Sequence, residues 1–190
     1  ATNLKYDATG EYHLAGLMKY TLGGDFNSRL NINLRENKGY TYGARSNFSS
    51  GKYNGEFVFS SGIRADATDS ALTEVLNEIS QYQKNGIKPD ELTFMKSSIG
   101  QRDARLYETP GQKAGFINRM LEYNLPSNFV KQQNTILNNL TKARVDGLAH
   151  KWLDLSKMNI LLVGDKKKIL PGLKKFGFEI IELDTDGNLK

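Results

Sequence analysis

The spacing of apolar residues predicts a helical N-terminal part that gives way to strand-like alternation near residue 40. Over residues 11–22 the apolar side chains fall on one helical stripe, and Gly23-Gly24 follow as a stop signal. A second, short helix is predicted over residues 28–37, and Gly39 suits its left-handed end. Three apolar residues of this helix are expected to be partly buried: Leu30, Ile32 and Leu34.

Alternating aromatic and small residues then predict an antiparallel hairpin over residues 40–49 and 53–63, joined by turn-forming residues 50–52. A helix to about residue 84 is expected to follow, with Asp66 or Thr68 as its N-terminal cap. Residues 86–91 read as a connection to another helix. Pro89 suits the first turn of that helix, which is predicted to run to about residue 107.

The rest of the chain is predicted to be three more helices and a strand–helix–strand unit. The helices cover residues 112–122, 128–137 and 141–153. A buried strand over 157–163, a helix over 165–176 and a last strand over 178–183 complete the pattern. The predicted fold class is α+β, with one mixed, mostly antiparallel sheet and helices packed mainly on one face. The length of 190 residues predicts a single domain over residues 1–190.

Composition excludes several classes of site. The chain has no cysteine, which excludes disulfides, thiolate zinc sites and cysteine nucleophiles. No apolar run approaches the roughly 20 residues of a membrane-spanning helix. The net charge of +5 comes partly from Lys166-Lys167-Lys168 and Lys174-Lys175, which are typical of a solvated helix face. We therefore expect no nucleic-acid partner, although a basic nucleic-acid-binding module stays open on charge alone.

Recognisable catalytic motifs are missing from the sequence. Its two histidines, His13 and His150, lie far apart, so neither H-E-x-x-H nor H-x-x-E-H can form, and we expect both to be structural. No G-x-S-x-G, Walker or G-x-G-x-x-G motif occurs. These observations leave the stretch "LRENKGYTYG", residues 34–43, as the candidate for chemistry.

Two residues of this stretch have both an ordinary and a functional interpretation. Arg35, near a helix end, either forms a surface ion pair with Glu36 or Asp25, or holds a peptide carbonyl group. Tyr42, at the start of a strand, either packs in the sheet or donates a hydrogen bond to a developing oxyanion.

Residues 20–46 resemble the second, non-catalytic half of the insulinase–pitrilysin family of zinc metallopeptidases. The matching positions are Leu22-Gly23-Gly24, Ser28-Arg29-Leu30, Leu34-Arg35-Glu36, Gly39 and Tyr42. Residues 85–99, "NGIKPDELTFMKSSI", and 159–169, "NILLVGDKKKI", also resemble segments of that half, in the same order. The resemblance therefore covers roughly residues 10–180.

The resemblance implies a half domain of the LuxS and processing-peptidase type, and a divided active site. In this family another half carries the H-x-x-E-H zinc motif, and the non-catalytic half closes over it. Arg35 would then position the substrate backbone, and Tyr42 would stabilise the tetrahedral oxyanion. No metal is expected on this chain. Zinc is expected on a catalytic half, in the same polypeptide or in a partner subunit, and the substrate is a peptide or protein.

The resemblance also implies a C-terminal fragment of a longer peptidase. Family domains begin with a strand before the first helix, and here only residues 4–6 could form it. A bacterial periplasmic or secreted location is favoured by the resemblance alone. A non-enzymatic structural subunit, like the core-like proteins of respiratory assemblies, is the alternative, although the retained spacing of Arg35 and Tyr42 argues against it.

Overall fold

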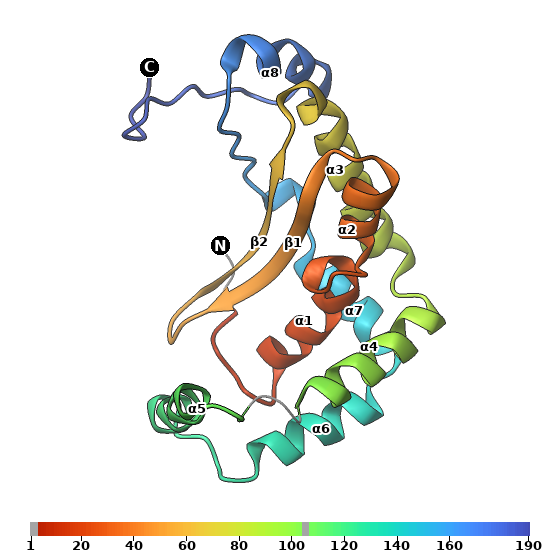
Figure 1. Ribbon diagram of the computed structural model, residues 1–190, viewed down its shortest axis with the longest axis vertical. Helices are drawn as coiled ribbons and strands as arrows, with labels where there is room; N and C mark the ends of the chain where they lie inside the picture. The colour runs from red at the N-terminus through yellow and green to blue at the C-terminus, as the bar shows by residue number, and fades with distance from the viewer. Residues whose placement is uncertain (1–3, 104–106) are drawn as a thin grey trace.

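The computed structural model describes residues 4–103 and 107–190, and confirms the α+β class (Figure 1). Most of the described chain is helical, and the described strands form one antiparallel hairpin. In chain order the elements are α1 (Glu11–Lys19), η1 (Tyr20–Gly24), α2 (Arg29–Asn31), η2 (Ile32–Asn37), β1 (Thr41–Ser50), β2 (Gly55–Ile63), η3 (Ala65–Ala67), α3 (Thr68–Asn85), α4 (Pro89–Asp103), α5 (Pro110–Glu122), α6 (Phe129–Asn139), α7 (Lys142–Trp152), η4 (Leu155–Lys157), α8 (Lys166–Leu173) and η5 (Lys174–Phe176).

The two N-terminal helices form where predicted, and each ends in a wider π-helical turn. Gly23 leaves helical geometry there. A Cβ atom at this position would lie 2.5 Å from Ser46 Oγ, so glycine allows η1 to approach β1 closely. In the second helix Leu30 and Leu34 are fully buried, as the core-facing positions require. The expectation for Ile32 is wrong, because this side chain is exposed, at 40%, on the opposite face of the helix.

The inner face of the hairpin forms one side of the hydrophobic core. Even-numbered residues of β1 from Ala44 to Phe48 point inward, and Arg45 and Asn47 point outward, as the two-residue period of a strand requires. The rings of Phe48 and Phe57 lie 5.0 Å apart between their centroids. Figure 1 shows α1, α2, α3 and α7 on one side of the hairpin, which confirms helices packed mainly on one face.

The middle helices also form where predicted, but the expected cap of α3 is wrong. Ala67 is its N-cap residue and no side chain caps it. Asp66 instead accepts two hydrogen bonds from the Arg64 guanidinium, and the Thr68 hydroxyl donates to the Ala65 carbonyl at 3.1 Å. The short helix η3 occupies the preceding turn, so neither side chain is free to cap. Pro89 opens α4 as predicted. The helix is described as far as Asp103 and Tyr107 lies in a turn, so the expected end near residue 107 can be compared only across residues 104–106, which are outside the described chain.

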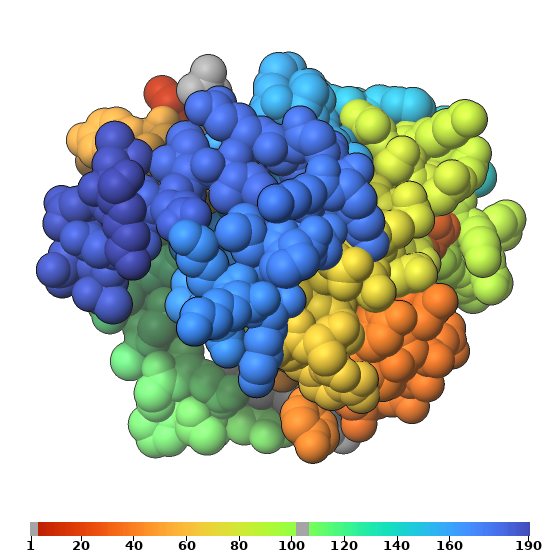
Figure 2. Space-filling view, turned by 90° about the horizontal axis from the view of Figure 1, so that it is seen from above, coloured from red at the N-terminus to blue at the C-terminus, as the bar shows by residue number. Residues whose placement is uncertain are grey.

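The two C-terminal strands were predicted wrongly. Residues 158–163 and 178–182 have no regular secondary structure, and the described sheet is two-stranded rather than mixed. Leu161 and Val163 are 77% and 93% exposed, so the apolar run is not a buried strand. An apolar run predicts a strand only if a neighbour offers hydrogen bonds, and neither segment pairs with the hairpin. The helix between them forms as α8, capped by Asp165, on the surface seen in Figure 2.

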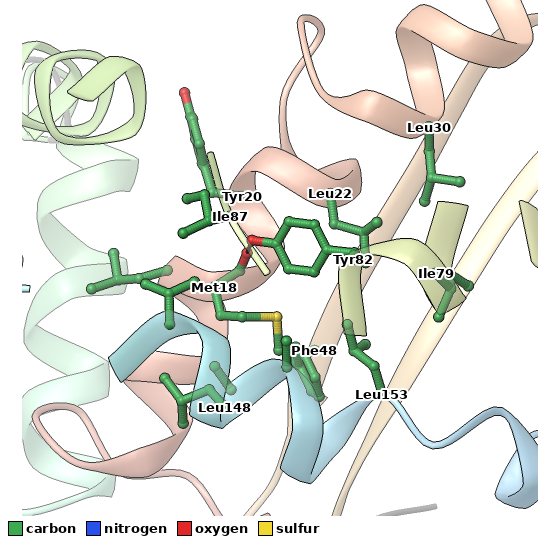
Figure 3. Packing of buried hydrophobic residues seen from close by; sticks show 14 of the residues in the cluster. Met18, Tyr20, Leu22, Leu30, Phe48, Ile79, Tyr82, Ile87, Leu148 and Leu153 are labelled. Carbon is green, nitrogen blue, oxygen red and sulfur yellow. Dashed lines mark hydrogen bonds between the residues drawn. The ribbon is translucent and has the colours of Figure 1, made fainter. Parts of the chain in front are cut away.

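The core lies between the hairpin and the surrounding helices, and Tyr82 of α3 is its largest fully buried side chain (Figure 3). Its hydroxyl donates to the Met18 carbonyl at 2.8 Å. That bond uses the only proton of the phenol, so the Thr21 hydroxyl, 3.0 Å away, donates to Tyr82. Burial raises the pKa of Tyr82, more than the bond from Thr21 lowers it. The phenol therefore stays neutral, and it ties α3 to the end of α1.

A largely buried ion pair fastens α2 to the turn between α3 and α4. Arg29 donates from Nε and Nη2 to the two carboxylate oxygens of Glu91, at 2.5 and 2.6 Å, and from Nη2 to the Gly86 carbonyl at 3.0 Å. The guanidinium also lies 4.7 Å from the ring centroid of Tyr82. Burial lowers the pKa of Arg29, but the bonds and charge of Glu91 outweigh it and raise the pKa overall. This pair fixes where the second helix sits.

We expect Arg29→Met to destabilise the fold by about 3 kcal/mol, because it leaves the Glu91 carboxylate buried without its cation. Urea unfolding followed by circular dichroism measures this loss. The matched control is Arg64→Met, since Arg64 makes the same two-bond contact with Asp66 at the surface, with side-chain exposures of 60% and 72%. The control should unfold at nearly the same urea concentration as the unchanged chain. Equal losses for the two variants would contradict the assigned role of Arg29.

Candidate functional site

The candidate site begins with Tyr42, whose side chain is fully exposed, at 100%. The ordinary interpretation, packing within the sheet, is therefore wrong. Even-numbered residues of β1 face the core, so regular alternation would point Tyr42 inward. The pairing shifts by one residue between Thr41, opposite Ile63, and Ala44, opposite Ser61. This β-bulge turns the phenol to solvent, in the way that bulges redirect side chains at functional sites.

Short polar contacts hold the bulge in shape. The Thr41 hydroxyl accepts from the Gly43 amide at 3.0 Å and donates across the hairpin to the Gly62 carbonyl at 2.8 Å. Ser61 Oγ lies 2.9 Å from both Thr41 Oγ1 and the Gly43 carbonyl oxygen. On the core side, the Ala44 amide donates to a side-chain oxygen of Asn31 at 2.9 Å. These hydrogen bonds satisfy the amides of Gly43 and Ala44 and so stabilise the bulge.

Arg35 lies in the last turn of η2, and its side chain is one-third exposed. Its guanidinium carbon lies 4.3 Å from the centroid of the Phe26 ring, within cation–π range. Nη1 donates to Glu36 at 2.7 Å. The expected ion pair with Glu36 therefore exists. Asp25 instead accepts from the Tyr20 hydroxyl at 2.7 Å and from the Asn27 amide at 3.0 Å.

A glycine-based turn joins the helix that carries Arg35 to the strand that carries Tyr42. Gly39 has a φ of 62°, which confirms the predicted left-handed helix end. Its amide donates to the Arg35 carbonyl at 3.1 Å, and the Tyr40 amide donates to Leu34 at 2.8 Å. The Arg64 amide then donates to the Tyr40 carbonyl at 3.1 Å. Both ends of the stretch are therefore anchored through the backbone, with Tyr42 exposed and Arg35 partly exposed.

The other residues considered from the sequence lie elsewhere. His13 is mostly buried in α1, and burial lowers its pKa despite a hydrogen bond to the backbone of Gln133. His150 is exposed in the last turn of α7. Within residues 4–103 and 107–190, no three His, Asp or Glu side chains gather to hold a metal ion. None of the helices in these ranges is long and apolar enough to cross a bilayer.

Sequence analysis proposed the pair but missed the residues that contact its two segments. The bulge had one local signal, the isolated Gly43 inside a strand pattern, which often marks such an irregularity. Phe26 lay in a loop and Asn31 inside a short helix, where no spacing distinguishes them. Their importance depends on contacts with residues 9 and 13 positions away, which only the fold reveals.

The sequence profile of the family described as peptidase M16 inactive domain matches residues 3–99. These residues hold the helices η1 to η2, the bulged hairpin and the whole Arg35–Tyr42 stretch. The chain belongs to this family. The resemblance to a non-catalytic half of zinc metallopeptidases is thereby confirmed.

Several solved structures are similar to this one. A peptidase M16 inactive domain from Pseudomonas fluorescens is 28% identical with a TM-score of 0.72, over 81% of this chain and 37% of that one. A protease from Helicobacter pylori is 16% identical with a TM-score of 0.66, over 79% and 36%. An inactive peptidase domain from Bordetella parapertussis, of a protein assigned as a zinc protease, is 15% identical with a TM-score of 0.62, over 82% and 84%.

This M16 domain spans little more than a third of the first two of those chains. The similarity to the Helicobacter pylori and Bordetella parapertussis structures, at 16% and 15% identity, shows a shared fold alone. A search of curated proteins finds no match.

The turn at Gly39 gives a test of the site's backbone. A Cβ atom at this position meets nothing within 4 Å, so a substitution is limited by the positive φ and not by space. We expect Gly39→Ala to lower the free energy of unfolding by about 1 kcal/mol, because L-residues disfavour this conformation. Gly39→Asn should cost less, since asparagine tolerates it. Equal costs in thermal unfolding would contradict the left-handed turn.

Proposed function

We propose that this chain is the substrate-binding and active-site-completing half of a zinc-dependent endopeptidase. It supplies Arg35 and Tyr42 to a zinc site located on another domain or subunit. The observation that carries the proposal is the bulge of β1, which turns a phenol from the core side to full exposure, in the strand that follows the helix end holding Arg35. A tyrosine that only stabilised the sheet would pack against the core, whereas a tyrosine that contacts a second domain or subunit must be exposed.

The chemistry follows from the two side chains. Zinc on the catalytic half would activate a water molecule and polarise the scissile carbonyl group. The Tyr42 hydroxyl donates one hydrogen bond, directed at the negative charge that develops on the carbonyl oxygen in the transition state. The guanidinium of Arg35 offers several donors in a fixed plane, which suits the carbonyl groups of an extended peptide. Since both groups reach the site only when the two halves meet, hydrolysis would follow enclosure of the substrate.

The relatives support a partner half and a location outside the cytoplasm. This chain spans 37% of the similar Pseudomonas fluorescens chain, so such proteins have ample length for a second half. The similar inactive domain from Bordetella parapertussis comes from a protein assigned as a zinc protease. A periplasmic protease, PqqL from Escherichia coli, shares the fold with a TM-score of 0.60. We propose the bacterial periplasm or secretion accordingly, with a peptide or protein as substrate.

Removing the phenol hydroxyl is the most direct test of the role of Tyr42. In the peptidase that combines this chain with its zinc-bearing half, Tyr42→Phe should lower kcat by about 10²- to 10³-fold, the usual effect of losing one oxyanion donor. KM should change little, because the bond forms only in the transition state. Steady-state kinetics on a fluorogenic peptide measures both constants.

The matched control for this test is Tyr53→Phe. Tyr53 lies in the turn of the same hairpin, is 76% exposed, and is not adjacent to Arg35 in the turn around Gly39. Its loss should leave kcat and KM unchanged. An unchanged kcat for Tyr42→Phe would exclude the oxyanion role and favour the alternative, a structural subunit of the same fold.

The ion pair between Arg35 and Glu36 should compete with the substrate. Its side chains are 33% and 54% exposed, so the contact is weak. We expect Glu36→Gln to lower KM by up to about fivefold with little change in kcat, because Arg35 is then freed to bind the peptide. Glu56→Gln, at an exposed carboxylate of β2, is the control. A rise in KM for Glu36→Gln would show that the pair holds Arg35 in its working position instead.

A further inference from the structure

Asn31 is a buried polar residue that touches both halves of the candidate site. Its side chain is only 3% exposed, at the end of α2. Nδ2 donates to the carbonyl oxygen of Phe26 at 2.7 Å, and Oδ1 accepts from the amide of Ala44 at 2.9 Å. A buried amide with both ends satisfied is held in one orientation, because exchanging its oxygen and nitrogen would set donor against donor and acceptor against acceptor.

The two partners of Asn31 are the backbones nearest to the working side chains. Phe26 carries the ring beneath the guanidinium of Arg35, at 4.3 Å. Ala44 is the residue at which β1 regains regular pairing after the bulge that holds Tyr42. One side chain therefore connects the loop under the arginine with the strand that presents the tyrosine.

The bond to Ala44 also fixes the register of the bulge. Thr41 pairs with Ile63 and Ala44 pairs with Ser61, so one residue of β1 is left over between them. Without the extra residue of the bulge, regular alternation would place Tyr42 in the inward-facing series with Ala44 and remove it from the surface. The contact from Asn31 favours the observed register, because only there does the Ala44 amide point at the buried oxygen.

We infer that Asn31 is a positioning residue for the divided active site. It holds the Tyr42 bulge in register and the Phe26 platform under Arg35, without touching the substrate. This inference rests on the proposed function, since positioning has meaning only if Tyr42 and Arg35 act on a substrate.

A double-mutant cycle in the assembled peptidase tests the inference. Asn31→Leu keeps the volume but removes both hydrogen bonds, and should lower kcat by about 10- to 100-fold through a small misplacement of Tyr42. In the Tyr42→Phe background the same change should lower kcat by less than about threefold, because there is no hydroxyl left to misplace.

The outcomes separate this inference from the proposed function. If Tyr42→Phe lowers kcat but Asn31→Leu acts equally in both backgrounds, Asn31 is merely structural and the inference fails alone. If Tyr42→Phe itself has no effect, the proposed function fails and takes the inference with it.

A measurement on the unmodified protein covers the case in which Asn31→Leu does not fold. Amide hydrogen exchange should show the Ala44 amide protected as strongly as an amide of β1 that faces β2, such as that of Asn47 opposite Val58. Exchange of Ala44 at the rate of an exposed loop amide would overturn the inference, since the amide would then lack the partner that fixes the register.

Discussion

The ion pair of Arg29, the largely buried cation of α2, determines how the N-terminal half of this domain packs. Arg29 contacts Glu91, Gly86 and the ring of Tyr82, and none of these groups lies near it in sequence. Because an unpaired charge in such a place is costly, α2 has one position against the α3–α4 turn. That position sets the start of η2, and hence the place where Arg35 emerges. The ion pair thus acts on the site from a distance, through the packing of a helix.

The exposure of Tyr42 departs from the regular alternation of the strand that carries it. A strand that buries Ala44 and Phe48 would also bury Tyr42, and the bulge resolves the conflict by adding one residue. Hydrogen bonds from both sides stabilise the bulge: Asn31 accepts from the Ala44 amide on the core side, and Thr41 donates to the Gly62 carbonyl across the hairpin. The result is an exposed phenol on an anchored strand, which is what the proposed divided site requires.

The sequence was informative where local chemistry decides the structure, and misleading where distant partners do. Gly39 and Pro89 identified their turns because their backbone preferences act within a few residues. The strands expected at 157–163 and 178–183 failed because their pairing depends on a neighbour that no local pattern specifies. Asn31 was overlooked for the same reason, since an asparagine in a short helix gains its meaning from Ala44, which lies far along the chain.

The central claim is that Tyr42 binds the transition state and not the substrate. The affinities of two ligands of the same sequence for the assembled peptidase test it directly: a phosphinic peptide, which mimics the tetrahedral intermediate, and an uncleaved peptide. We predict that Tyr42→Phe lowers the affinity for the phosphinic peptide by about the factor by which it lowers kcat/KM. The affinity for the uncleaved peptide should stay unchanged. Unchanged affinity for both ligands would contradict the claim.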